Sequence, residues 1–234
     1  MVENFKKIIF PILVAIICSM NGCSNDLFGI FASSGLKDRW ETRNVFKFLT
    51  PDNRLPDNSA SPFGDKYSFI VVGDTHIQDG DVSNLKKLKP VIDNSGGEIK
   101  FVVFCGDVTQ NGKTEDINKF KTLATEYSVP CYPVIGNHDI YFNTWPNWKK
   151  LIGSTCYKVK WSGTTLLMLD SANGFFGVEQ LEWLEKEVKA AKGKLFVFTH
   201  ANMFMKSMFD QQQFTDVRER ARVVAALDGK CDIM

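Results

Sequence analysis

Residues 67–76 read Tyr67-Ser68-Phe69-Ile70-Val71-Val72-Gly73-Asp74-Thr75-His76. The first six residues are mostly β-branched or aromatic, which is typical of a buried β-strand. Gly73 ends this run, and Asp74 and His76 follow where the strand would leave its sheet. An apolar strand with polar side chains directly after it is the pattern from which the organisation of the chain can be derived.

The same pattern recurs three times further along the chain. Strand-like runs at 100–105, 129–135 and 195–199 are followed by Gly106-Asp107, Gly136-Asn137-His138-Asp139 and His200, respectively. In a doubly wound sheet the carboxyl ends of the strands meet at one edge, where binding sites form. The sequence therefore predicts that these polar side chains lie together. All three histidines of the chain belong to these strings.

Segments with helical periodicity alternate with the strand-like runs. The sequence predicts helices at 83–93, 114–127, 179–191 and 215–227, and adjacent strands at 157–161 and 164–170. Apolar strands that alternate with helices are typical of an α/β fold with helices on both faces of the sheet. A chain of 234 residues, 44% of them hydrophobic, suits one domain with a substantial core. The net charge of +1 indicates neither a nucleic-acid-binding protein nor a polybasic membrane-surface protein.

The start of the chain has the features of an export signal. Lys6-Lys7 precedes a short apolar run at 8–18, and Gly22-Cys23 resembles the lipid-attachment site of bacterial lipoproteins. We therefore expect a signal peptide at 1–22, lipid on Cys23 and an extracytoplasmic, membrane-anchored protein of the cell envelope. Plain secretion and an uncleaved anchor are the alternatives.

The polar composition of residues 23–65 predicts a tether between this leader and the domain at 66–234. A mixed stretch within it, 40–49, is expected to form a strand or a short helix that packs on the domain.

The side chains after the strands are suited to binding divalent cations. Asp74 and His76 can chelate one cation, Asp107 can bridge two cations with its two oxygens, and Asn137 and His200 offer an amide oxygen and an imidazole nitrogen. Oxygen and imidazole ligands without thiolate suit Mn, Fe or Zn. Two such cations about 3.5–4 Å apart can hold a phosphoryl group and acidify the attacking water.

Two neighbouring residues are suited to proton transfer. His138 is next to the expected ligand Asn137, so it is a candidate acid for the leaving oxygen. Asp139 is then expected to orient the His138 imidazole.

Asp-x-His, Gly-Asp, Gly-Asn-His-Asp and a strand-end His, in that order over residues 67–200, resemble the calcineurin-like metallophosphoesterase superfamily. The resemblance implies a four-layer αββα sandwich of two mixed sheets and a small-molecule phosphate ester as substrate. It also implies Asp74 and His76 on the first metal, Asp107 bridging, Asn137 and His200 on the second metal, and His138 as general acid.

The chain departs from the pattern of this superfamily at its far end. The next motif, Gly-His-x-His, would supply one more ligand to each metal, and the sequence ends at Met234 before any such motif. We therefore expect a domain that is incomplete at its C-terminal end, with those positions absent or filled by water. The alternative to an enzyme is an impaired or inactive lipoprotein that keeps the fold as a binding or surface protein. A third alternative is a plain α/β carbohydrate- or nucleotide-binding protein.

The motifs also narrow the subclass within the resemblance. The Arg and Glu that distinguish serine/threonine phosphatases are absent, and Gln110 stands where purple acid phosphatases have a tyrosine ligand. The remaining likeness is to the bacterial phosphodiesterase and phosphomonoesterase branch. The sequence leaves the substrate, the metal and the oligomeric state open.

Overall fold

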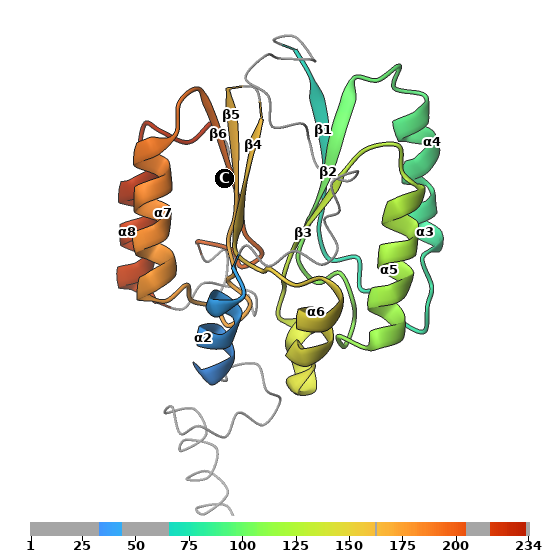
Figure 1. The fold of residues 1–234 in the computed structure, drawn as a ribbon, viewed down its shortest axis with the longest axis horizontal. Helices are drawn as coiled ribbons and strands as arrows, with labels where there is room; N and C mark the ends of the chain where they lie inside the picture. The colour runs from blue at the N-terminus through green and yellow to red at the C-terminus, as the bar shows by residue number, and fades with distance from the viewer. Residues whose placement is uncertain (1–32, 44–65, 162, 205–215, 233–234) are drawn as a thin grey trace, which may run out of the picture.

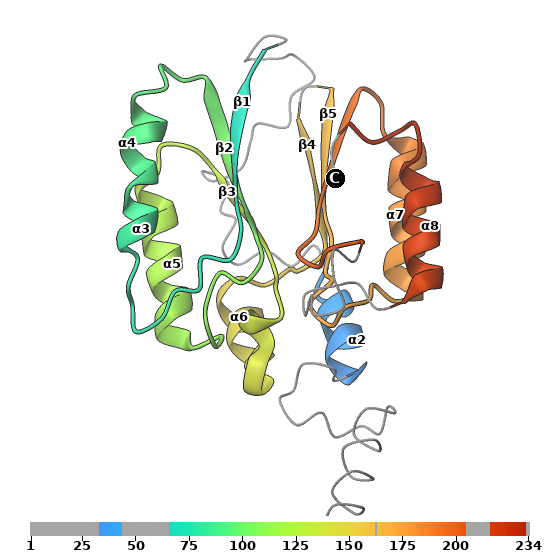
Figure 2. The same cartoon turned by 180° about the vertical axis from the view of Figure 1, so that it is seen from behind.

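The structure, a computed structural model, describes residues 33–43, 66–161, 163–204 and 216–232. Two three-stranded sheets face each other, and helices cover the outer face of each sheet (Figures 1 and 2). This arrangement confirms the predicted four-layer αββα architecture. The expected signal peptide and Cys23 lie outside the described residues. Among the helices of the described ranges, none has the length and apolar character needed to cross a membrane.

The first sheet has the strand order β1-β2-β3, and the helices α3, α4 and α5 cover it. Its elements are β1 (Ser68–Val72), α3 (Ser83–Lys86), α4 (Leu88–Asp93), β2 (Ile99–Cys105), α5 (Thr114–Glu126) and β3 (Cys131–Val134). Both strand pairs are parallel, so this sheet is not mixed within the described part of the chain. The single helix predicted at 83–93 is divided at Lys87. Pro90 has no N–H to donate to the carbonyl of Lys86, which explains the interruption.

The second sheet has the strand order β4-β5-β6 and is mixed, as predicted. Its elements are β4 (Tyr157–Trp161), β5 (Thr164–Met168), α7 (Val178–Ala190), β6 (Lys194–Phe198) and α8 (Val217–Leu227). β4 and β5 pair antiparallel, whereas β5 and β6 pair parallel. The parallel pair requires the crossover through α7, which packs with α8 on the outer face (Figure 2).

Aromatic side chains join the two sheets. Phe69 of β1 stacks on Phe101 of β2 with ring centroids 4.8 Å apart, and it meets the edge of Phe196 of β6 at 5.3 Å. Such ring pairs stabilise by about 0.5–1.5 kcal/mol beyond the area that they bury. The contact fixes the two sheets relative to each other.

Three elements were not predicted as they occur. Within the expected tether, α2 (Ser33–Glu41) is helical, and it overlaps the mixed stretch at 40–49 by only two residues. The chain after β3 forms a 3₁₀ segment (His138–Asn143) and then α6 (Trp145–Leu151). Trp145 and Trp148 are buried, so these tryptophans pack the loop after β3 onto the domain.

Candidate metal centre

The strand ends of both sheets bring the predicted polar side chains together. Asp74 and His76 follow β1, Asp107 follows β2, Asn137 and His138 follow β3, and His200 follows β6. The backbone of three of them is unusual, with φ of 53° at Asp74, 44° at His76 and 48° at Asp107. Positive φ is uncommon outside glycine and costs about 1–3 kcal/mol, and such strain concentrates at functional sites.

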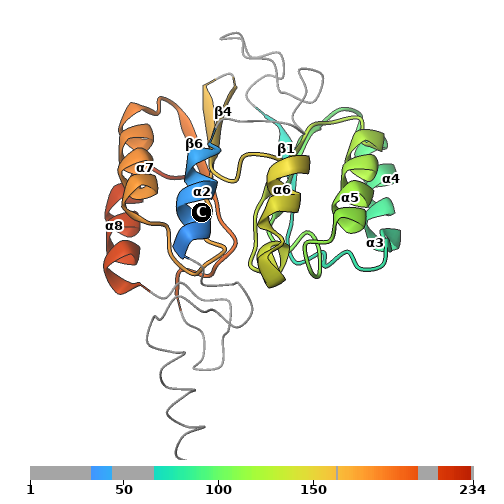
Figure 3. The same cartoon turned by 60° about the horizontal axis from the view of Figure 1, so that its bottom comes forward.

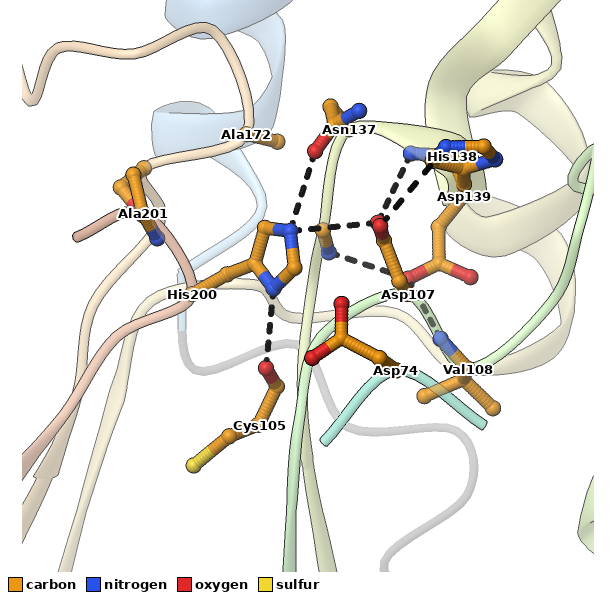
Figure 4. A network of polar contacts seen from close by, with 12 residues as sticks. Asp74, Cys105, Asp107, Val108, Asn137, His138, Asp139, Ala172, His200 and Ala201 are labelled. Atoms are coloured by element: carbon orange, nitrogen blue, oxygen red, sulfur yellow. Dashed lines mark hydrogen bonds and ion pairs between the residues drawn. The ribbon is translucent and has the colours of Figure 1, made fainter. Parts of the chain in front are cut away.

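Asp107 lies at the centre of the cluster (Figure 4). Its side chain belongs to two groups of three, one with His76 and His138 and one with Asp74 and His200, in which the candidate ligand atoms all lie within 4.8 Å of one another. Its Oδ2 is 3.8 Å from His76 Nε2 and 3.9 Å from His138 Nε2, and its Oδ1 is 3.3 Å from His200 Nε2. One carboxylate therefore faces two possible cation positions.

The hydrogen bonding of Asp107 fits a cation. Its Oδ1 accepts the backbone N–H of His138 at 2.9 Å. Its Oδ2 is buried and receives no hydrogen bond from the described residues. A buried carboxylate oxygen without a donor is costly. A divalent cation would satisfy it, and the surrounding oxygen and imidazole donors are the ligands that Mn, Fe and Zn accept.

His200 and Asn137 contact each other across the two sheets. His200 Nδ1 lies 3.0 Å from the Cys105 carbonyl oxygen, and His200 Nε2 lies 3.0 Å from Asn137 Oδ1. The Asn137 amide donates to the Tyr141 hydroxyl at 2.8 Å, which turns its oxygen toward His200. Because the Cys105 carbonyl and the Asn137 amide oxygen only accept, both ring nitrogens donate, and Nε2 is the one that faces the centre. Tyr141, four residues after Asn137, was not predicted.

The charges of Asp107 and His200 support each other. Burial disfavours both charged forms, but the hydrogen bond and the attraction between the two side chains outweigh it. The pKa of the Asp107 carboxyl is held below its usual value, and the pKa of the His200 imidazole is raised. A cation that binds beside them would have to displace a proton from His200, so its affinity depends on pH.

The predicted contact between Asp139 and the His138 ring is wrong. The Asp139 carboxylate is fully buried and accepts the backbone N–H groups of Gly136, Val108 and Thr109, at 3.0, 3.2 and 2.8 Å, and the Thr109 hydroxyl at 2.9 Å. His138 Nδ1 instead lies 2.9 Å from the Gln110 carbonyl oxygen. Asp139 thus ties the loop after β3 to the loop after β2, because these unpaired N–H groups need an acceptor.

Replacement of Asp139 by asparagine should therefore destabilise the fold. The amide NH₂ would face N–H donors, and we expect the free energy of unfolding to fall by about 3 kcal/mol. Burial raises the pKa of Asp139 to about 6, against the N–H donors that lower it, so urea unfolding should be measured at pH 8, where the carboxyl is charged. Asp79→Asn, the same change at a side chain that is 76% exposed, is the control and should leave the midpoint unchanged. Equal midpoints for both variants would contradict the role of Asp139.

Two glycines allow the strand ends to approach. A Cβ on Gly136 would lie 2.2 Å from the backbone nitrogen and Oδ1 of Asp107, although the φ of Gly136 is not positive. A Cβ on Gly106, where φ is 82°, would lie 2.5 Å from Cγ and Nδ1 of His200. Gly136 is therefore required by space and not by a turn conformation.

A polar pocket adjoins the cluster at His76. Its volume is about 180 Å³, and besides His76 its lining includes Thr75, Gln78, Ser83 and Asn84. Thr75 donates its hydroxyl hydrogen to the Val108 carbonyl at 2.8 Å, which joins the wall of the pocket to the loop of Asp107.

Comparison with known proteins gives a family match and curated relatives. The family model of the calcineurin-like phosphoesterases matches residues 67–227. A probable cyclic nucleotide phosphodiesterase of Fibrobacter succinogenes is 27% identical over 139 residues, which cover 55% of this chain and 54% of the relative. A probable glycerophosphodiester phosphodiesterase of Arcobacter nitrofigilis is 28% identical over 130 residues, which cover 51% of this chain and 45% of the relative. The chain thus spans about half the length of the curated relatives it matches.

Two solved structures share the fold. A purple acid phosphatase from yellow lupin (Lupinus luteus) seeds superimposes with a TM-score of 0.53 at 17% identity, over 72% of this chain and 37% of that protein. A dimetal phosphatase from Danio rerio gives a TM-score of 0.53 at 13% identity, over 72% of this chain and 79% of that protein. At these identities the likeness supports the two-sheet architecture and nothing more.

Proposed function

This chain belongs to the calcineurin-like phosphoesterase family, and we propose that it hydrolyses phosphate esters of small molecules, phosphodiesters in particular, with two divalent cations. The observation that carries the proposal is the buried Oδ2 of Asp107, which has no hydrogen-bond donor among the described residues and is shared by two groups of candidate ligands. The phosphodiesterase names of the curated relatives favour diesters.

We assign the chain's residues to two cation positions around Asp107. Asp74 and His76 would hold one cation, Asn137 and His200 the other, and Asp107 would contact both. This division differs from the two three-residue groups, which join His76 with His138 and Asp74 with His200. When bound, the cations neutralise the phosphoryl oxygens and acidify the attacking water. The polar pocket beside His76 would receive a hydroxyl-bearing substituent of the ester, since its lining offers hydroxyl and amide groups.

His138 is proposed as the acid that protonates the leaving oxygen. The Gln110 carbonyl accepts the Nδ1 proton, so Nε2 is the nitrogen that can hold and release a second proton. The ring is 19% exposed, and it packs on Tyr141 with centroids 4.2 Å apart, which restricts its orientation. A ring in this position can reach a substrate while its other nitrogen stays fixed.

Metal-dependent hydrolysis by the full chain tests the proposal. The protein is stripped with a chelator, its metal content is measured, and turnover of bis(p-nitrophenyl) phosphate is followed as Mn²⁺ is added. We expect no turnover without metal, recovery with Mn²⁺, and two equivalents bound per chain. Metal binding without turnover would instead favour a binding protein that keeps the fold. If the protein showed neither metal binding nor turnover with Mn²⁺, Fe²⁺ or Zn²⁺, the metal centre would be ruled out.

A further inference from the structure

We propose that α2 is a strap that sets the spacing between the two halves of the metal centre, and that Arg39 within it is a positioning residue for His200. The inference rests on the metal centre proposed above. It concerns a segment that precedes residues 67–227, the part matched by the family model. Figure 3 shows α2 and α6 next to each other.

Arg39 attaches α2 to the second sheet. Its side chain is 1% exposed, and its Nε donates to Asp170 Oδ2 at 2.5 Å while Nη2 donates to Asp170 Oδ1 at 3.2 Å. Nη2 also donates to Asn173 Oδ1. A guanidinium that binds a carboxylate through two nitrogens fixes both distance and direction. Arg39 therefore holds the loop that follows β5 in one position.

That loop holds both neighbours of His200. Ser171, next to Asp170, accepts the Thr199 hydroxyl at 2.7 Å and the backbone N–H of Ala201 at 2.9 Å through its Oγ. His200 lies between these two residues. A displacement of the Asp170 loop is thus passed to the backbone on each side of His200, and the imidazole has to follow.

Asp38 attaches the same helix to α6, which follows the first sheet along the chain. It accepts the Lys149 ammonium at 2.6 Å and the Trp145 indole N–H, both from α6. α6 directly follows the 3₁₀ segment that begins at His138, next to Asn137. Successive side chains of an α-helix point about 100° apart, so Asp38 can contact α6 while Arg39 contacts the loop after β5.

The contact that depends on this spacing is the one between Asn137 and His200. Asn137 Oδ1 and His200 Nε2, which come from different sheets, are 3.0 Å apart. Each ligand atom must lie within about 0.2 Å of its ideal distance from the metal, which also constrains how far apart two ligands of one metal lie. A helix anchored on both sides of this contact is well placed to keep it.

The test uses Arg39→Met and Arg39→Lys in the full chain, with Arg43→Met as the matched control. Arg43 is an exposed arginine just after α2 that lies over the Trp40 ring. The chain has only three histidines, so the ring signals of each can be followed by NMR in metal-free protein. We expect Arg39→Met to shift the His200 ring signals and to weaken one of two Mn²⁺ equivalents about 10–100-fold. Arg39→Lys should restore part of both, and Arg43→Met should change neither.

Two outcomes would overturn the inference. One is an Arg39→Met protein that is folded by circular dichroism and has wild-type His200 signals and wild-type Mn²⁺ affinities. If Arg39→Met does not fold, Ser171→Ala takes its place, because it keeps the ion pair and removes only the link to Thr199 and Ala201. Unchanged His200 signals in Ser171→Ala are the second outcome. Because the NMR measurement needs no metal, a wild-type protein that binds none would defeat the proposed function and leave this test intact.

Discussion

Asp107→Asn is expected to abolish hydrolysis of bis(p-nitrophenyl) phosphate, with a loss of at least about 1,000-fold in kcat/KM, beyond the 10–100-fold typical of a residue that only supports a ligand. The reason is the shared position of this carboxylate. Both candidate cation groups include Asp107, and an amide cannot offer two anionic oxygens. The variant should therefore lose affinity for both Mn²⁺ equivalents, whereas loss of any other ligand would chiefly affect one.

Thermal unfolding gives a readout of this loss that is independent of turnover. A ligand at a hundred times its Kd stabilises the folded state by about 2.7 kcal/mol, so Mn²⁺ should raise the Tm of the wild type and leave that of Asp107→Asn almost unchanged.

The control for Asp107→Asn is another buried aspartate. Asp116 lies on α5 and is 1% exposed. Its carboxylate accepts the backbone N–H of Gly80 at 2.8 Å, and an amide oxygen can accept this hydrogen bond equally well. Asp116→Asn should keep both turnover and the Mn²⁺-dependent rise in Tm. An Asp107→Asn protein that retained a tenth or more of the wild-type kcat/KM would show that Asp107 is not shared by the reacting cations.

Gly106→Ala is expected to disrupt the centre from the backbone side. The new methyl group would lie 2.5 Å from the His200 ring. The backbone at position 106 also has a φ of 82°, which an L-residue adopts only at a cost. The strained φ costs about 1 kcal/mol and the overlap about 1–3 kcal/mol more. We expect a fall of about 3 kcal/mol in the free energy of unfolding, with displacement of His200 and loss of the Mn²⁺ equivalent proposed to bind there.

Gly97→Ala separates the two causes. Gly97 has φ of 81°, but nothing lies within 4 Å of the position of its Cβ. This variant should show only the backbone cost, about 1 kcal/mol, with unchanged Mn²⁺ binding. Equal unfolding free energies and equal Mn²⁺ affinities for the two alanine variants would show that the close contact between position 106 and the His200 ring does not affect stability or metal binding.

The sequence predicted most of the frame because the relevant signals are local. Apolar strand runs that end in Gly-Asp or Gly-Asn-His-Asp indicated both β1–β3 and the positions of Asp74, Asp107 and Asn137. The pairing of β4 with β5 followed from two short strand-like runs, 157–161 and 164–170, with only two residues between them. These patterns depend on neighbours in sequence, so no knowledge of distant contacts was needed.

The remainder could not be predicted because it depends on contacts between distant residues. Arg39 and Asp170 are 131 positions apart, and neither has a local pattern that identifies the other. Asp139 looked like a partner for its neighbour His138, but its carboxylate serves N–H groups 30 and 31 residues earlier. The helix α6 has only seven residues and begins with Trp-Pro, so its periodicity was too short to detect.

The residues of the proposed metal centre come from both sheets, and this has a consequence for how the protein folds during synthesis. The hydrogen bond between His200 and Cys105 closes a loop of 95 residues, and such high contact order slows folding. Asp74, His76, Asp107, Asn137 and His138 leave the ribosome before β6, whereas His200 becomes available only after β6 has been synthesised and has docked. The first sheet can therefore form while the centre is still open on one side. We therefore expect metal to load at the proposed centre late, after the second sheet has docked.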